Sequence, residues 1–273
     1  MGGIDNGLAA AAFARHHWEM IALHLAGTYR RSVAASVARI RENVLDWQHL
    51  SALHAASFAA CALVDADSHG WRIRLVNQGS DAPQILKLHI APDTSTDRVV
   101  TEAGFGTGSE IRVTVTAHGP HQSGVVVDYH VPETDPDRLA MIGMAFVAIY
   151  TQLWDEDEAM MVAREAALAP RPKAPIHVDL GPESTLVLPR AFDFGSGRFR
   201  LLRQDGALIA HSVTCPHWLG PLDGAIDGDG CVTCPWHGYR FDVATGDSAD
   251  GRGLRLAPAP RIHIENGRVI ASL

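Results

Sequence analysis

The sequence predicts an α+β protein in which a larger mixed unit precedes a small all-β unit. Residues 58–130 alternate apolar and polar side chains over about six short segments separated by turn signals, which is typical of an antiparallel meander. Residues 135–168 form an unbroken pattern of helix formers that opens with T-D-P, a helix start. Residues 169–175 read A-P-R-P-K-A-P, a proline-rich linker, and only short alternating segments follow it.

These patterns divide the chain of 273 residues into four parts. We expect an N-terminal helix within residues 1–28, because residues 7–26 are rich in helix formers and Gly27 follows them. Residues 29–168 form the mixed unit and residues 169–175 the linker. Residues 176–273 form the all-β unit, in which Asn266–Gly267 between two alternating segments indicates a hairpin.

Within the mixed unit, residues 29–38 are expected to form a strand and residues 39–57 to show helical spacing. A strand, short helices, a meander and a long closing helix resemble the helix-grip fold of START-like ligand-binding proteins. The resemblance implies a curved sheet that wraps the long helix around an apolar cavity. Six side chains are candidates for the cavity wall, although packing in an ordinary core explains each of them equally well: Phe58, Trp71, Ile85, Phe105, Phe146 and Ile149.

Composition limits the classes of function. A net charge of −8 argues against a nucleic-acid partner, which normally requires a basic face. No segment has the pattern of a signal peptide or a membrane span. Three of the four cysteines lie in one short stretch, which suits a metal site in a reducing compartment better than a disulfide framework, so we expect a cytoplasmic protein.

That stretch carries the clearest motif in the chain. It pairs Cys215 with His217 in C-P-H-W and Cys234 with His237 in C-P-W-H-G. The two pairs resemble the Rieske motif, which implies a [2Fe–2S] cluster with one iron on Cys215 and Cys234 and the other on His217 and His237. A zinc site that uses Cys231 is the alternative, but zinc ligand pairs are normally two to four residues apart, and Cys215 and His217 are separated by one.

A second candidate metal site lies at residues 42–54, which read E-N-V-L-D-W-Q-H-L-S-A-L-H. Asn43, Asp46 and His49 are three apart and share one face of a helix. His49 and His54 would lie about 140° apart around a straight helix, so they can share one ion only if the helix breaks between them. We expect Ser51 to cap a second short helix at this break.

Two histidines need a carboxylate to complete the facial triad of a non-heme ferrous iron. The long helix offers a run of four acidic residues, 155–158. Asp157 lies about 40° from the apolar stripe of the helix and Glu156 about 60° from it, whereas the other two point away. We therefore predict Asp157 as the third ligand, with Glu156 as the alternative.

The pattern E-N-x-x-D-x-x-H-x-x-x-x-H resembles the mononuclear-iron motif of Rieske non-heme iron oxygenases. The resemblance implies that Asp46 bridges His49 and His237 of a neighbouring subunit, that Asn43 lies near the iron, and that the Glu-Asp step provides a ligand. Large subunits of that family place the Rieske domain first, whereas here it comes last. A homo-oligomer, with a trimeric ring favoured, could still join one chain's cluster to the next chain's iron.

The leading hypothesis is a Rieske mono- or dioxygenase component with a [2Fe–2S] cluster and a mononuclear Fe(II). Its partners would be O₂, a small apolar substrate, aromatic ones included, and a separate reductase or ferredoxin, since the chain has no nucleotide or flavin fingerprint. Two alternatives remain open. One is a helix-grip binding protein fused to a Rieske electron-transfer module without a second iron, and the other is a redox sensor.

Overall fold

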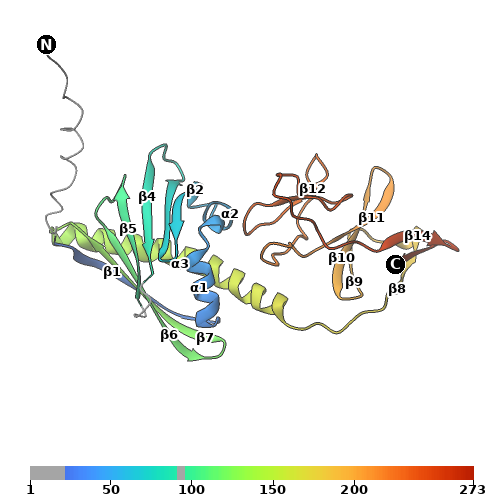
Figure 1. Ribbon diagram of the computed structural model, residues 1–273, viewed down its shortest axis with the longest axis horizontal. Helices are drawn as coiled ribbons and strands as arrows, with labels where there is room; N and C mark the ends of the chain where they lie inside the picture. Colours follow the sequence, from blue (N-terminus) through green and yellow to red (C-terminus); the bar gives the residue numbers. More distant parts are fainter. Residues whose placement is uncertain (1–21, 91–95) are drawn as a thin grey trace, which may run out of the picture.

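The computed structural model describes residues 22–90 and 96–273 and confirms the α+β class (Figure 1). A large antiparallel sheet and one long helix form the first unit, and a small all-β unit follows. Figure 1 shows the long helix running beneath the sheet and projecting toward the second unit. Among the helices in the described ranges, none is long and apolar enough to cross a membrane.

The sheet of the first unit has seven antiparallel strands in the order β1-β7-β6-β5-β4-β3-β2. The period-two pattern predicts six of them, and all six are present. Their bounds are β2 Phe58–Asp67, β3 Gly70–Asn77, β4 Pro83–His89, β5 Thr96–Ala103, β6 Glu110–Gly119 and β7 Gln122–Val131, and β1 is His24–Val33.

Three helical elements precede β2, and one follows β7. They are α1 Val37–Leu45, the 3₁₀ helix η1 Trp47–His49, α2 Leu50–Leu53 and α3 Pro136–Leu168. Ser36 caps α1 by accepting from the Arg39 N–H, and Asp135 caps α3 by accepting from the Asp137 and Arg138 N–H groups. The first core lies between the sheet, α1 and α3 and includes Val33, Ile40, Val127, Phe146 and Trp154.

The start of β1 corrects two sequence expectations. The predicted N-terminal helix falls largely on residues 1–21, outside the described residues, but His24 already pairs with Val131 in the sheet. The predicted strand 29–38 is therefore displaced, and α1 begins at Val37. Gly27 does not end a helix. It packs against α3, where a Cβ atom would lie 2.9 Å from the Cα of Gly143, so pairing with β7 and this close approach override helix propensity.

The second unit consists of short strands in three small sheets. Two of these sheets enclose a core that includes Leu180, Phe192, Phe199, Leu201 and Val269. The strands are β8 His177–Pro182, β9 Arg190–Phe194, β10 Gly197–Gln204, β11 Ala207–Ser212, β12 Cys231–Thr233, β13 Arg240–Asp242, β14 Arg261–Glu265 and β15 Arg268–Ser272, with a 3₁₀ helix η2 at Glu183–Thr185.

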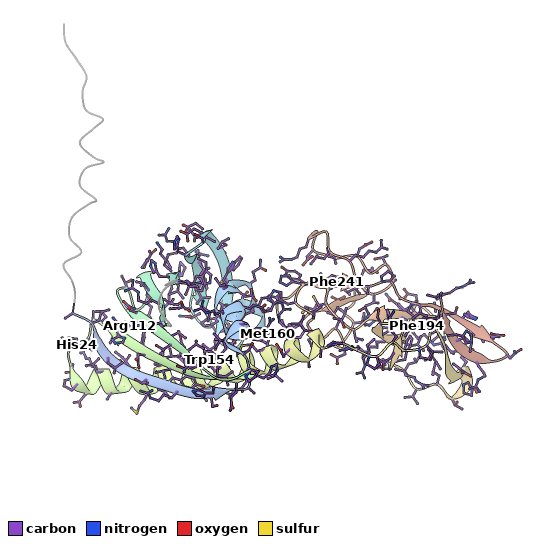
Figure 2. All side chains as sticks on the ribbon, turned by 60° about the horizontal axis from the view of Figure 1, so that its bottom comes forward. His24, Arg112, Trp154, Met160, Phe194 and Phe241 are labelled. Atoms are coloured by element: carbon purple, nitrogen blue, oxygen red, sulfur yellow. The ribbon has the colours of Figure 1, made fainter. Side chains whose placement is uncertain are left out.

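Helix α3 joins the two units by contributing to the cores of both. Trp154 belongs to the core under the sheet, whereas Met160, further along α3, is buried in a core with Trp236, Tyr239 and Phe241 of the second unit (Figure 2). The chain then passes beneath the second unit and enters it at β8, at its far end (Figure 1). The metal-motif loops consequently face back toward α1 and α2.

Candidate metal centres

The two motif loops of the second unit have the same local shape. In each loop the N–H group four residues after the cysteine donates to that cysteine's carbonyl, Leu219 to Cys215 at 3.0 Å and Gly238 to Cys234 at 2.9 Å. Leu219 and Gly238 both have positive φ, at 65° and 70°. Each loop therefore turns back sharply after its cysteine, and two cysteine–histidine pairs are presented side by side.

These four side chains fit a [2Fe–2S] cluster. Cys215 and Cys234 are buried, and the Nδ1 atoms of His217 and His237 are buried without a hydrogen-bond partner in the described structure. The two imidazole rings lie 4.5 Å apart at 83°. Burial and the charge of His237 lower the pKa of His217 to about 4, which keeps its ring in the neutral form that binds metal. A side chain at Gly220 would lie 2.8 Å from the Cys234 sulfur, so glycine leaves that space free.

Cys231 takes no part in this arrangement. It is buried on β12, and its sulfur lies 3.9 Å from the Asp229 carbonyl oxygen. The Cys231 N–H donates to Asp227, which fixes the turn before the second loop. Cys231 is therefore a small buried residue that supports the turn, apart from the two cysteine–histidine pairs.

The second candidate centre brings together His49, His54 and Asp157, all buried, with one potential ligand atom from each within 4.8 Å of the others. The Asp157 Oδ1 atom lies 3.4 Å from His49 Nε2 and 3.2 Å from His54 Nε2. Donor atoms bound at about 2.1 Å in adjacent octahedral positions lie about 3 Å apart, so this spacing suits one face of a metal ion. Two imidazoles and one carboxylate are the donor set of a non-heme ferrous site.

Further side chains hold this triad. The Asn43 side-chain amide donates to Asp157 Oδ1 at 2.9 Å, and Glu156 Oε2 lies 2.5 Å from His54 Nδ1. The structure thus separates the two predicted ligand alternatives: Asp157 faces both Nε2 atoms, and Glu156 holds the opposite edge of His54. A carboxylate on the outer nitrogen of a ligating histidine fixes its orientation and makes it more basic. The sequence offered Glu156 only as the alternative ligand, and its contact with the outer nitrogen of His54 was not expected.

The break that lets both histidines converge lies earlier than predicted. Ser51 does not cap α2, because α2 begins at Leu50 and Ser51 lies inside it. The residue before α2, His49, makes no side-chain cap hydrogen bond. Asp46 ends α1 instead, and its carboxylate accepts from the Gln48 N–H to start η1. The expectation about Ser51 was therefore wrong, since the side chain of Asp46 caps the corner by accepting from the Gln48 N–H.

Asp46 also joins the two candidate centres within one chain. Its Oδ2 atom lies 2.6 Å from His237 Nε2 and 3.5 Å from His49 Nδ1. Burial alone would raise the pKa of the Asp46 carboxyl, but its contacts with His237 and His49 hold it well below its usual range. The sequence expectation placed His237 on a neighbouring subunit. The structure corrects it, because the second unit folds back so that its own His237 reaches Asp46.

Two further contacts hold the cluster loops against the first unit. The Tyr239 hydroxyl donates to Gln48 Oε1 at 3.0 Å, and the Tyr239 ring stacks on His217 with centroids 4.5 Å apart. Arg164 of α3 donates to the Trp218 carbonyl at 3.0 Å, and its guanidinium carbon lies 4.4 Å from the Trp218 ring centroid. No local sequence pattern indicates a role for Gln48 or Arg164, because each contacts a partner far away in the chain.

An apolar cavity of about 630 Å³ lies between the sheet and α3 and reaches His49, His54 and Asp157. Five of the six predicted wall residues line it: Phe58, Trp71, Phe105, Phe146 and Ile149. Ile85 does not, because Gln84 and Leu86 beside it on β4 face the cavity and the strand alternates.

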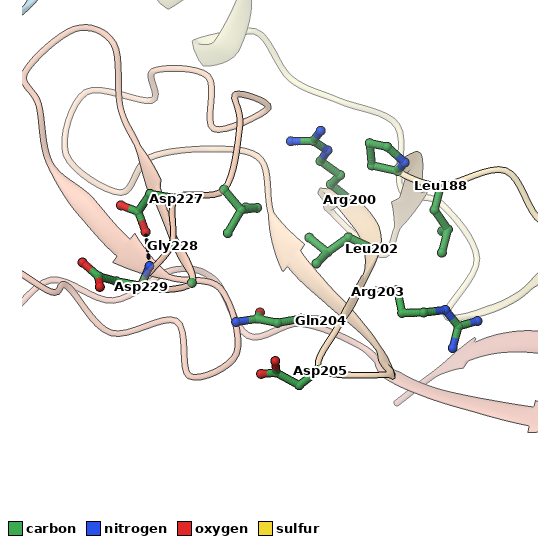
Figure 3. Close-up of a pocket in the computed structure, with 12 residues that line it drawn as sticks. Leu188, Arg200, Leu202, Arg203, Gln204, Asp205, Asp227, Gly228 and Asp229 are labelled. Atoms are coloured by element: carbon green, nitrogen blue, oxygen red, sulfur yellow. Dashed lines mark hydrogen bonds between the residues drawn. The ribbon is translucent and has the colours of Figure 1, made fainter.

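A second hollow of about 610 Å³ lies on the all-β unit between β10 and the turn at residues 226–230 (Figure 3). Several of its charged groups have partners within the unit. Arg200 donates to the Asp223 carbonyl at 2.8 Å, and Asp227 accepts from the Asp229 and Cys231 N–H groups. The side-chain oxygen of Gln204, which also lines the hollow, is buried without a hydrogen-bond partner among the described residues.

Comparison with known proteins agrees with the geometry of the second unit. Residues 158–259 match the Rieske [2Fe–2S] domain, a match that begins within α3. Apoptosis-inducing factor 3 of Mus musculus and of Homo sapiens is 35% identical over 80 residues, 29% of this chain. Pheophorbide a oxygenase of Oryza sativa subsp. japonica is 39% identical over 70 residues, 22% of this chain.

The chain spans 13% of the length of each of these relatives. Among solved structures, it is similar to a START superfamily protein from Mycobacterium smegmatis, with a TM-score of 0.42 and 20% identity over 50% of this chain and 95% of that one. The chain thus carries a C-terminal Rieske [2Fe–2S] domain after a unit built from an antiparallel sheet and one long helix.

Proposed function

We propose that this protein is a Rieske-type oxygenase component that passes electrons from its [2Fe–2S] cluster to a mononuclear iron held by His49, His54 and Asp157. The observation that carries the proposal is the position of Asp46, with one carboxylate oxygen 2.6 Å from His237 and 3.5 Å from His49. One carboxylate thus lies between the two sets of candidate ligands, with a hydrogen bond to His237 and a longer contact to His49. Similarity of the Rieske domain to that of an oxygenase supports the same reading.

The cluster would supply single electrons at a potential raised by its histidine ligands, and the ferrous iron would bind and activate O₂. The protein's own residues do the rest. Cys215, Cys234, His217 and His237 would hold the cluster. Asp46 bonds His237 Nε2 at 2.6 Å and faces His49 Nδ1 at 3.5 Å, so one carboxylate would orient the outer nitrogen of each ring.

The second unit would deliver electrons to the first unit of the same chain. Met160 packs inside the second core, and the bonds from Tyr239 to Gln48 and from Arg164 to the Trp218 carbonyl fix how the two units meet. A trimeric ring is then not needed to bring cluster and iron together. The electrons would come from a separate reductase or ferredoxin, because the sequence has no nucleotide or flavin fingerprint.

The cavity sets the class of substrate. Its wall is mostly aliphatic and aromatic, and it reaches the triad at one end, so a small apolar molecule would be held beside the iron and away from bulk water. Asn43 donates to Asp157 and keeps the carboxylate in place. Hydroxylation, cis-dihydroxylation, demethylation and desaturation all fit such a site.

Metal analysis tests the proposal against a binding protein with a Rieske module alone. The oxygenase requires about three irons and two acid-labile sulfides per chain, and the binding protein requires two irons. Changing His49→Ala together with His54→Ala should remove one iron and leave the Rieske absorption and electron paramagnetic resonance spectra unchanged. A wild-type protein with only two irons after anaerobic loading with Fe(II) would contradict the proposal.

The route within one chain has its own test. A Cys234→Ser variant lacks the cluster and a His49→Ala variant lacks the iron, so mixing them restores electron transfer only if one chain serves another. We expect no restoration in rapid-mixing measurements of cluster reoxidation by O₂, and sedimentation of the mixture reports whether the two variants associate. Restored reoxidation would show transfer between chains.

A further inference from the structure

Three hydroxyl groups gather on the sheet side of the cavity. Thr101 on β5, Ser109 just before β6 and Tyr129 on β7 all line it. The Ser109 hydroxyl donates to Thr101 Oγ1 at 3.0 Å. A Cβ atom at Gly106 would lie 3.4 Å from Ser109 Oγ and 3.7 Å from the Tyr129 hydroxyl, so these two oxygens face the same small region.

The backbone holds two of these hydroxyls in place. The Thr101 N–H donates to the Ser109 carbonyl at 3.0 Å, and the Gly108 N–H donates to the Thr101 carbonyl at 2.8 Å. The intervening loop turns through positive φ at Gly104, Gly106 and Gly108, which a glycine adopts without strain. The hydroxyl cluster is therefore a fixed feature of the cavity wall.

Counting hydrogens leaves donors without acceptors. Ser109 uses its hydrogen on Thr101, and among the described residues neither the buried Thr101 hydroxyl nor the half-buried Tyr129 hydroxyl donates a hydrogen bond to a side chain or to the backbone. Thr101 and Ser109 are 8% and 1% exposed. Because a buried hydroxyl without a partner costs about 1–3 kcal/mol, an acceptor atom on a bound molecule would satisfy a group the protein leaves open.

The three hydroxyl groups of Thr101, Ser109 and Tyr129 lie far from the candidate iron site. The Tyr129 ring stacks on Phe146, with centroids 4.6 Å apart, and Phe146 lies against Tyr150, with centroids 4.2 Å apart. Phe146 and Asp157 are eleven residues apart on α3, which corresponds to about 16 Å along a helix. Between the two ends the helix side of the cavity is therefore an aromatic wall.

The charges around the cavity select against an anionic ligand. No lysine or arginine is found among the described residues that line it. The ionisable groups on the wall are the two histidines of the triad and the carboxylates of Asp46, Asp157 and Glu133. A carboxylate or phosphate on the ligand would have no cation to pair with, whereas a neutral oxygen would suit the hydroxyl donors.

We propose that Thr101, Ser109 and Tyr129 form a subsite for a neutral carbonyl or hydroxyl oxygen. The ligand is an elongated, flat and otherwise apolar molecule whose oxygen binds at this subsite while its other end reaches the triad. Its flat body lies along Phe146 and Tyr150. The orientation of the ligand rests on the proposed function, because the iron defines the end that is oxidised.

The test compares two probes of the same shape, 4-acetylbiphenyl and 4-ethylbiphenyl, which differ by a carbonyl oxygen. Binding to the protein as isolated is measured from the quenching of its tryptophan fluorescence, since Trp71 and Trp154 line the cavity. We expect the ketone to bind about 5-fold more tightly than the hydrocarbon, the effect of one net hydrogen bond. Thr101→Val and Tyr129→Phe should each reduce this preference, and together they should abolish it.

Thr151→Val is the matched control, because Thr151 is exposed on α3 and its hydroxyl donates to the Val147 carbonyl. It should keep the wild-type preference. Equal affinities of the wild type for both probes, including no measurable binding of either, would overturn the proposal, as would an unchanged preference in the double variant. Iron content measured on the same samples separates the two proposals, since a chain without the third iron can still prefer the ketone.

Discussion

The two candidate centres are built in different ways. The cluster loops draw all four metal-binding side chains from residues 215–237, and each loop closes on itself through a bond to its own cysteine carbonyl. The triad combines the corner after α1 with α3, and its supporting bonds join residues 114 and 102 positions apart. The first centre therefore depends on local chain geometry, and the second depends on how α3 packs against the rest of the unit.

Removing one cluster thiolate should have the largest effect. Cys234→Ser should lose about two irons per chain together with the Rieske optical and electron paramagnetic resonance signals, because a serine hydroxyl does not replace a thiolate. Cys234 also lies in the second core, so the melting temperature of this unit should fall. Cys231→Ser is the matched control and should keep the cluster. Loss of the metal from the Cys231→Ser variant would instead support the zinc-type site in which Cys231 is a ligand.

The two neighbouring acids on α3 should have separable effects on the triad. Asp157→Asn should abolish binding of the third iron, since the amide is a much weaker ligand than the carboxylate. Glu156→Gln should keep the iron with affinity lowered by about 10- to 100-fold, because it removes only the partner of His54 Nδ1. Fe(II) titration under anaerobic conditions measures both. The reverse order of effects would make Glu156 the ligand.

The contrast between the centres also explains which features could be predicted from the sequence. The strands of the meander and α3 follow from period and capping, and both are present as predicted. The cluster loops were predicted from the resemblance of two cysteine–histidine pairs to the Rieske motif. The triad also required the angular position of Asp157 on α3, which a straight helix fixes, and Asp157 does lie beside both histidines.

Features set by tertiary contacts were missed or misplaced. His24–Val33 reads partly as helix, but pairing with β7 makes it a strand. The family resemblance implied that His237 comes from a neighbouring copy, whereas the cluster unit folds back and its own His237 reaches Asp46. The contact of Gln48 with Tyr239 joins side chains 191 positions apart, and no local pattern in the sequence signals it.

Asp46→Asn should break the link between the centres and leave both of them loaded. Asparagine keeps an oxygen that can cap the Gln48 N–H, but it removes the negative charge shared by His237 and His49. Reoxidation of the reduced cluster by O₂ should slow by about 10- to 100-fold, the usual cost of losing such a partner, with iron content unchanged. Asp155→Asn, an exposed acid on α3, should reoxidise at the wild-type rate. Equal rates in both variants would remove Asp46 from the route.

The contact between Tyr239 and Gln48 should give the smallest effect and the finest test of how the units meet. Tyr239→Phe keeps the ring on His217 and under Arg252 but deletes the hydroxyl, which should cost about 0.5–1.5 kcal/mol of stability. Gln48→Leu should cost a similar amount, and the double variant should cost little more than either single change, because both remove the same bond. Denaturant unfolding of the four proteins measures this coupling. Fully additive losses would mean that the two side chains are not bonded, and that the cluster loops are held on the first unit by α3 through Met160 and Arg164.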